Sequence, residues 1–135
     1  MTASRAARIL FPVAAAVVLL GGCGATDDAP AERAEHFHQA LADGDAAGAC
    51  DDLAEETRTS LEQQEGKPCD QAITSQDLSA DLDRVETEVY GSMAQVRLGD
   101  ETVFLSRFDD GWRVTAAGCQ PTSGDRPHDC ALEAG

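Results

Sequence analysis

Hydrophobic and polar residues follow two different periods along this chain, one in each half. From Pro30 to Leu41, and again from Ala46 to Leu61, apolar residues recur every three to four positions, which predicts two amphipathic helices. A shorter apolar stretch from Cys69 to Thr74 predicts a third helix. Asp43-Gly44-Asp45 separates the first two, because Gly44 suits the left-handed end of one helix and Asp45 suits the N-cap of the next.

From Arg84 onward the period changes to two, which is typical of strands with one buried face. Four strands are predicted, over residues 84–89, 94–98, 102–108 and 112–116. Asp110-Gly111, between the last two, is a strong hairpin signal and favours a type I′ turn. The tail over 118–135 is rich in Gly, Pro, Asp and Ser and is predicted to be a loop. Helices followed by a four-stranded antiparallel meander indicate the α+β class.

The first 23 residues have the pattern of an export signal. Arg5 and Arg8 precede an apolar run from Ile9 to Leu20, which is too short to cross a bilayer. Leu20-Gly21-Gly22-Cys23 follows and resembles the lipobox of bacterial lipoproteins. That resemblance implies cleavage before Cys23, lipidation of its thiol with fatty acyl chains such as palmitate, and a position at the outer, extracytoplasmic face of the cell membrane. The expected organisation is a signal peptide over 1–22, a lipidated tether over 23–30 and a single domain over 31–135.

The charge balance narrows the classes of partner. The chain has a net charge of −15, and loss of residues 1–22, with two arginines and no acids, would make it −17. Nucleic acid is not an expected partner, because affinity for a polyanion depends on Lys and Arg. Anionic lipid headgroups would repel the domain too, so the acyl chains would have to hold it at the membrane.

Lipidation of Cys23 would leave an even set of four cysteines, Cys50, Cys69, Cys119 and Cys130. In an exported chain such a set predicts two disulfides. Four cysteines allow three pairings, and the sequence does not choose among them. We expect Cys50 with Cys69 and Cys119 with Cys130, each closing a short loop worth about 3 kcal/mol. A zinc site is disfavoured because no C-x-x-C or H-x-x-x-H spacing is present, and no metal or other cofactor is expected.

No paired nucleophile and base is evident, so no catalytic residue is predicted. His36 and His38 lie two positions apart on a helix and point about 200° apart, so they cannot share a metal. We expect one to be solvated and the other to lie at the rim of the core, without a carboxylate partner. His128 falls in the predicted tail loop.

Two acidic stretches also have structural explanations. The stretch that begins at Asp43 lacks calcium ligands at its fifth and twelfth positions, Ala47 and Ala54, so helix capping explains its aspartates. The acids of the second helix are predicted to form its solvated face: Asp51, Asp52, Glu55 and Glu56.

The order of elements resembles the small nuclear-transport-factor-2-like (cystatin-like) lipoproteins of bacterial envelopes. The resemblance is carried by residues 40–45, by Cys50, by Asp110-Gly111-Trp112-Arg113-Val114, and by the endings 116–119 and 127–130. It implies helices packed on a strongly bent sheet around a cone-shaped pocket. The function we expect is a non-enzymatic binding or interaction module for an envelope protein or a small apolar ligand. The alternative is an isomerase- or dehydratase-like enzyme in the cone, with Tyr90, Asp81 and Asp83 as the nearest candidates for its donor and acid.

Overall fold

The computed structural model describes residues 28–125 and 127–135. The predicted signal peptide, Cys23 and most of the tether lie outside the described residues. The helices are α1 (Ala29–Ala42), α2 (Ala46–Asp51), α3 (Glu55–Glu65), α4 (Cys69–Ala72) and the 3-10 turn η1 (Ile73–Ser75). The strands are β1 (Val85–Tyr90), β2 (Met93–Leu98), β3 (Glu101–Phe108), β4 (Gly111–Pro121) and β5 (His128–Glu133). In this described part, no helix is both long and apolar enough to cross a membrane.

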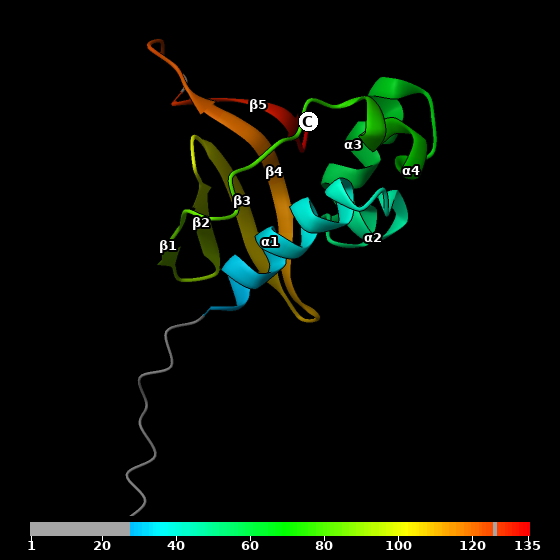
Figure 1. The fold of residues 1–135 in the computed structure, drawn as a ribbon. Coiled ribbons are helices and arrows are strands. Elements are labelled where there is room, and N and C mark those ends of the chain that lie inside the picture. The colour runs from blue at the N-terminus through cyan, green and yellow to red at the C-terminus, as the bar shows by residue number, and fades with distance from the viewer. Residues whose placement is uncertain (1–27, 126) are drawn as a thin grey trace, which may run out of the picture.

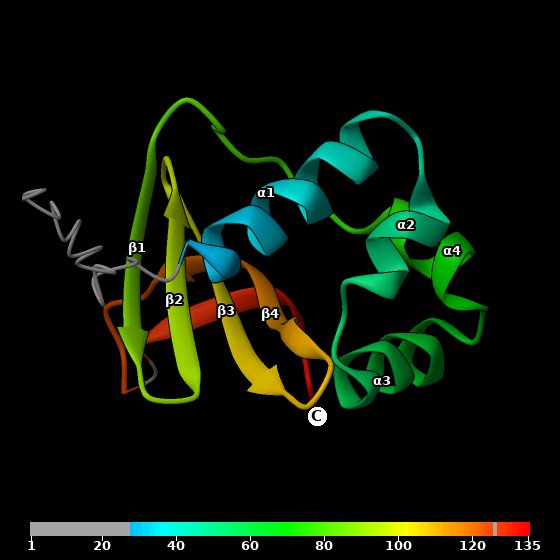
Figure 2. The same cartoon turned by 90° about the horizontal axis from the view of Figure 1, so that it is seen from below.

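The five strands form one antiparallel sheet in the order β1-β2-β3-β4-β5, so the α+β class is confirmed with one strand more than predicted. Helix α1 lies across one face of this sheet, which we call the inner face, and α2, α3 and α4 gather beside the first half of β4, which β5 leaves unpaired (Figures 1 and 2). β1 forms the opposite edge. Register shifts between β3 and β4 mark a bulge, which increases the local twist of the sheet.

The core lies between α1 and the inner face. Phe37 on α1 is fully buried, and it packs with inward side chains that alternate along the strands, among them Val96, Leu98, Val103 and Leu105. The alternation places the intervening residues of β2 and β3 on the opposite, outer face. The predicted helix 30–41 and the periods of β2 and β4 are therefore confirmed. The strand β1 is present, but its predicted buried face is wrong, because only Val85 on this edge strand is even partly buried.

The predicted helix from Ala46 to Leu61 is wrong in its middle. The chain leaves the helix after Asp51, and Leu53 forms a parallel bridge with Val114 at the free edge of β4. Val114 donates its N–H to the Asp52 carbonyl at 2.9 Å, and Ala54 donates to the Val114 carbonyl at 2.8 Å. Asp52, Leu53 and Ala54 are all buried. Three consecutive residues span about 200° around a helix, so one helix face could not bury them all.

The tail over 118–135 is only partly a loop, because β5 pairs with the second half of β4. The six residues of β5, HDCALE, contain no β-branched residue and no alternating apolar pattern, so local sequence does not mark a strand. Pairing with β4 supplies the backbone hydrogen bonds instead. Cys119 and Cys130 are direct cross-strand partners in this ladder, and their disulfide fixes the register.

The turns are partly as predicted. Gly44 has φ +77°, and the Asp45 side chain accepts a hydrogen bond from Gly48 N at 2.9 Å, which confirms the helix end and the cap. The Asp110-Gly111 hairpin exists, but its type I′ assignment is wrong. Gly111 (φ +111°) pairs with Phe108, and no non-glycine residue in the described chain has positive φ, so the two-residue loop is Asp109-Asp110.

Both expected disulfides are present: Cys50 with Cys69 and Cys119 with Cys130. The first joins α2 to α4, and both of its cysteines are buried. It therefore joins two short helices within the same buried cluster that contains Ala49, Leu61 and Ala72.

Candidate functional site

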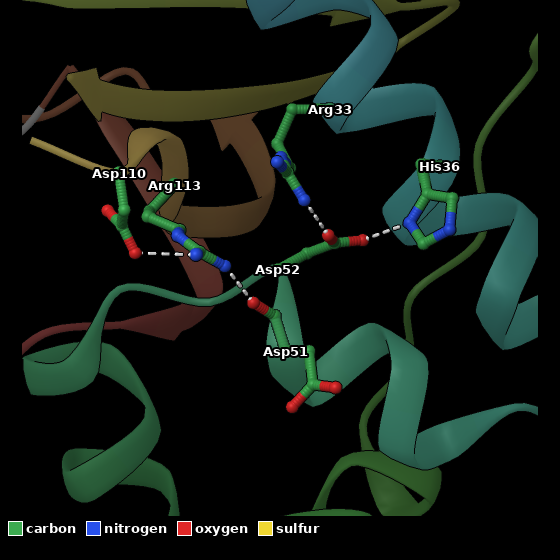
Figure 3. Close-up of polar contacts among 6 residues, drawn as sticks. All are labelled: Arg33, His36, Asp51, Asp52, Asp110 and Arg113. Carbon is green, nitrogen blue, oxygen red and sulfur yellow. Dashed lines mark hydrogen bonds and ion pairs between the residues drawn. The ribbon is translucent and has the colours of Figure 1, made fainter. Parts of the chain in front are cut away.

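Asp52 is the centre of a polar network where α1 meets the segment between α2 and α3. Its carboxylate is 1% exposed, and it accepts a hydrogen bond from Arg33 Nη1. Its second oxygen lies 2.5 Å from His36 Nδ1. Figure 3 shows this carboxylate between the two α1 side chains. A buried carboxylate needs such partners, because burial without them is costly. The network ties α1 to the segment that bridges β4.

Arg113 extends the network towards the β3–β4 hairpin. One of its guanidinium nitrogens donates to the backbone carbonyl of Asp51, and the other donates to Asp110 Oδ2 at 2.6 Å (Figure 3). That hydrogen bond holds the pKa of Asp110 below its usual value of 3.8. A lowered carboxylate pKa stabilises the fold at neutral pH, and this contribution is lost as the pH falls through the lowered value.

A groove of about 780 Å³ lies beside this network, between the 51–58 segment and the outer face of β3 and β4. Phe108, which is 49% exposed, and Leu53 and Ala54 supply apolar surface. Asp110 and Arg113 contribute polar atoms whose positions are set by their mutual contact. The volume is in the range of ligand-binding clefts, and apolar lining with a few fixed polar groups is their usual composition. This groove is the candidate functional site.

A smaller hollow of about 430 Å³ adjoins α1 and is lined by Arg33, His36 and Trp112, among others. A histidine oriented by a carboxylate is the arrangement of a general base. The His36 side chain is 62% exposed, however, and its partner carboxylate is shared with Arg33. Water surrounds the ring, so the pair is better suited to fixing α1 than to proton transfer in a water-excluded site.

As expected, one helix histidine, His36, is solvated and the other, His38, is buried. Both have carboxylate partners, which the sequence did not predict. The buried His38 places Nε2 2.9 Å from Glu101 Oε1 on β3, outside the geometry of a hydrogen bond. Glu101 Oε1 accepts a hydrogen bond from Gly118 N at 2.8 Å. These partners lie 16 and 63 positions away in the chain, so no local pattern marks them.

The acidic stretch of the predicted second helix divides between two environments. Asp51, Glu55 and Glu56 are exposed, as expected. Asp52 is buried, and its assignment to a solvated face is wrong, because its carboxylate is drawn to Arg33 and His36 of α1. Within residues 28–125 and 127–135, no group of three or more His, Cys, Asp or Glu side chains could hold a metal ion.

The residues considered for an enzymatic cone do not come together. Tyr90 ends β1 and is 62% exposed, whereas Asp81 and Asp83 precede that strand. Six residues of extended strand separate them by about 20 Å. Asp81 instead accepts a hydrogen bond from Asp83 N and pairs with Arg84, so it stabilises the turn before β1. His128 lies in β5 and stacks edge-on against Phe104, with ring centroids 5.1 Å apart.

Tyr90 is the one tyrosine in the sequence, so its ionisation can be followed directly. Its hydroxyl donates to Glu88 Oε2 at 2.6 Å, and this hydrogen bond raises its pKa above 10.0. We expect the ultraviolet absorbance of tyrosinate to titrate with a midpoint above pH 10, and this midpoint should fall in Glu88→Gln. In Glu86→Gln, on the same strand, the midpoint should stay unchanged, and equal midpoints in Glu88→Gln and the parent would contradict the contact.

Comparisons of the chain with known protein families, with curated proteins and with solved structures find no match.

Proposed function

We propose that this protein is a lipid-anchored, extracytoplasmic binding module whose ligand occupies the groove between the 51–58 segment and the β3–β4 hairpin. The groove itself is the observation that carries the proposal: about 780 Å³, with a half-exposed Phe108 beside polar groups that the Asp52 and Arg113 contacts hold in place. A large aromatic side chain left open to water in a cleft is a common feature of binding sites.

Two further observations support the cellular setting. The two disulfides fit an oxidising compartment outside the cytoplasm. The lipobox-like Leu20-Gly21-Gly22-Cys23 supplies the proposed anchor at the outer face of the membrane. A sheet with a bulge and with α1 packed on one face supports the nuclear-transport-factor-2-like assignment as part of the same proposal.

The anchor is tested by substitution of Cys23. Cys23→Ser removes the thiol that would carry the acyl chains, so we expect the variant to lack acyl chains and to be absent from the membrane fraction. Intact mass of the parent should correspond to a chain that starts at Cys23 and carries fatty acyl groups. Gly24→Ser is the matched control and should remain anchored. An unacylated parent would contradict the proposal.

The groove is tested with indole, a neutral aromatic probe, added to the mature acylated protein and followed by backbone amide NMR. We expect saturable shifts at Ser106, Phe108 and Thr115, with a dissociation constant of about 1 mM, as befits so small a ligand. Phe108→Ser should weaken binding about tenfold, because the phenyl ring supplies much of the apolar contact.

The matched control for this experiment is Val89→Ser, since Val89 is 42% exposed but lies on β1, away from the groove lining. It should leave indole binding unchanged. Shifts that do not saturate, or an equal loss in the two variants, would refute the groove as a binding site.

A further inference from the structure

The outer face of the sheet carries a row of residues that leads into the groove. Strand register places Tyr90 opposite Met93, Met93 opposite Ser106, and Ser106 opposite Arg113, so one row crosses β1, β2, β3 and β4. Tyr90 is 62% exposed and Met93 is 56% exposed. Ser106 and Arg113 line the groove at the other end of the row.

Phe108 connects this row to the groove. It lies two positions beyond Ser106 on β3, on the same face, which puts it about 7 to 8 Å diagonally from Met93. Tyrosine, phenylalanine and methionine are enriched at the centres of protein interfaces. Tyr90 and Met93 therefore lie in this row and Phe108 lies beside it, so the three largest exposed apolar side chains on this face are near one another and lead to the groove.

The charges at the groove end are unbalanced. Asp51, Glu55 and Glu56 line the groove, and in the described part of the chain no cation pairs with their carboxylates. The two arginines of the groove are already engaged, Arg58 with Glu62 and Arg113 with Asp110. Glu55 and Glu56 also favour the first turn of α3, where negative charge is stabilising. Their charges still face solvent at the mouth of the groove and attract cations.

We propose that this surface docks an extended basic segment of a protein partner, with its Lys or Arg side chains at Asp51, Glu55 and Glu56 and its apolar side chains over Phe108, Met93 and Tyr90. The inference rests on the proposed function and names the chemistry of its ligand. Three strand spacings separate β1 from β4, about 14 Å, which an extended segment covers with about four residues.

Charge complementarity selects this occupant over the others. A second copy, cleaved before Cys23, would bring another net charge of −17 to an already acidic groove. Nucleic acid and anionic lipid would be repelled for the same reason. A basic peptide gains both contacts, the ionic one at the groove and the apolar one along the row.

The test uses the mature acylated protein in vesicles of zwitterionic phosphatidylcholine and an eight-residue fluorescent peptide. The peptide carries two lysines followed by leucine and phenylalanine at alternate positions, and a matched peptide has glutamate in place of lysine. We expect the basic peptide to bind, the acidic one to fail, and affinity to fall with added salt. Asp51→Asn/Glu55→Gln/Glu56→Gln should weaken binding about tenfold, since each exposed pair contributes modestly. Met93→Ser should weaken it about threefold.

The matched control is Asp77→Asn/Asp83→Asn/Asp100→Asn, which removes three exposed charges away from the groove and should change affinity less than about twofold. An equal loss in the two triple variants would show generic attraction and overturn the inference. Indole binding without peptide binding would overturn it while leaving the groove intact, whereas loss of indole binding too would overturn the proposed function. If the protein forms a dimer that Met93→Ser dissociates, the surface binds a second copy of the chain, and this result would also overturn the inference.

Discussion

Replacing Cys50 and Cys69 together with alanine is expected to lower the free energy of unfolding by about 3 kcal/mol or more. The cysteines are 19 positions apart, and release of a loop of that length restores about 3 kcal/mol of chain entropy to the unfolded state. Both side chains are buried, so truncation also removes packing between α2 and α4. A loss of this size is a large fraction of the stability of a small domain.

Urea denaturation followed by the fluorescence of Trp112, the one tryptophan and a buried residue, measures this change. Cys119→Ala/Cys130→Ala is the matched comparison, because its loop is shorter and its strands keep their backbone ladder. We expect it to cost about 3 kcal/mol by chain entropy alone, with faster amide exchange confined to β5. A loss below about 1 kcal/mol for the Cys50 and Cys69 variant would contradict the assigned role.

Asp52→Ala is expected to lower the free energy of unfolding by about 2 to 3 kcal/mol. The substitution leaves Arg33 and His36 without their shared buried partner. Breaking a fully buried pair costs about 3 to 5 kcal/mol, but the Arg33 side chain is 32% exposed and keeps part of its hydration, which reduces the loss. Asp52→Asn keeps the shape and one acceptor, so its cost should be smaller.

The control is the neighbouring Asp51→Ala, whose exposed carboxylate pairs with no cation in the described part of the chain. Its cost should stay within about 0.5 kcal/mol. The double variant Arg33→Ala/Asp52→Ala should lose less than the sum of the two single variants, because the two side chains contact each other. Equal effects of the substitutions at positions 51 and 52 would contradict the network.

Binding at the groove should respond to the same change. Asp52 holds the segment that carries Asp51, and Asp51 in turn accepts a hydrogen bond from Arg113 at the groove. We therefore expect Asp52→Ala to shift Asp51 and Arg113 at the groove, although Asp52 itself does not line the groove.

Local pattern was sufficient where a residue's role depends on its neighbours in the chain. The helix at 30–41 follows from the spacing of residues such as Ala34 and Phe37, and the β2 strand follows from alternation such as Ala94, Val96 and Leu98. Gly44 and Asp45 marked a helix end and a helix start for the same reason. The pairing of the cysteines, which the sequence left open among three possibilities, was settled by the structure.

The tertiary structure decided what depends on partners far away in the chain. Residues 52–54 leave the helix because the free edge of β4 offers hydrogen bonds at Val114, 61 positions after Leu53. β5 is a strand because the second half of β4 offers its edge away from β3 for pairing, although the residues of β5 have no strand pattern of their own. The groove needs the 51–58 segment and the β3–β4 hairpin side by side. Sequence spacing fixes which face of an element is apolar, whereas hydrogen bonds and ion pairs between distant segments form only after the chain has folded.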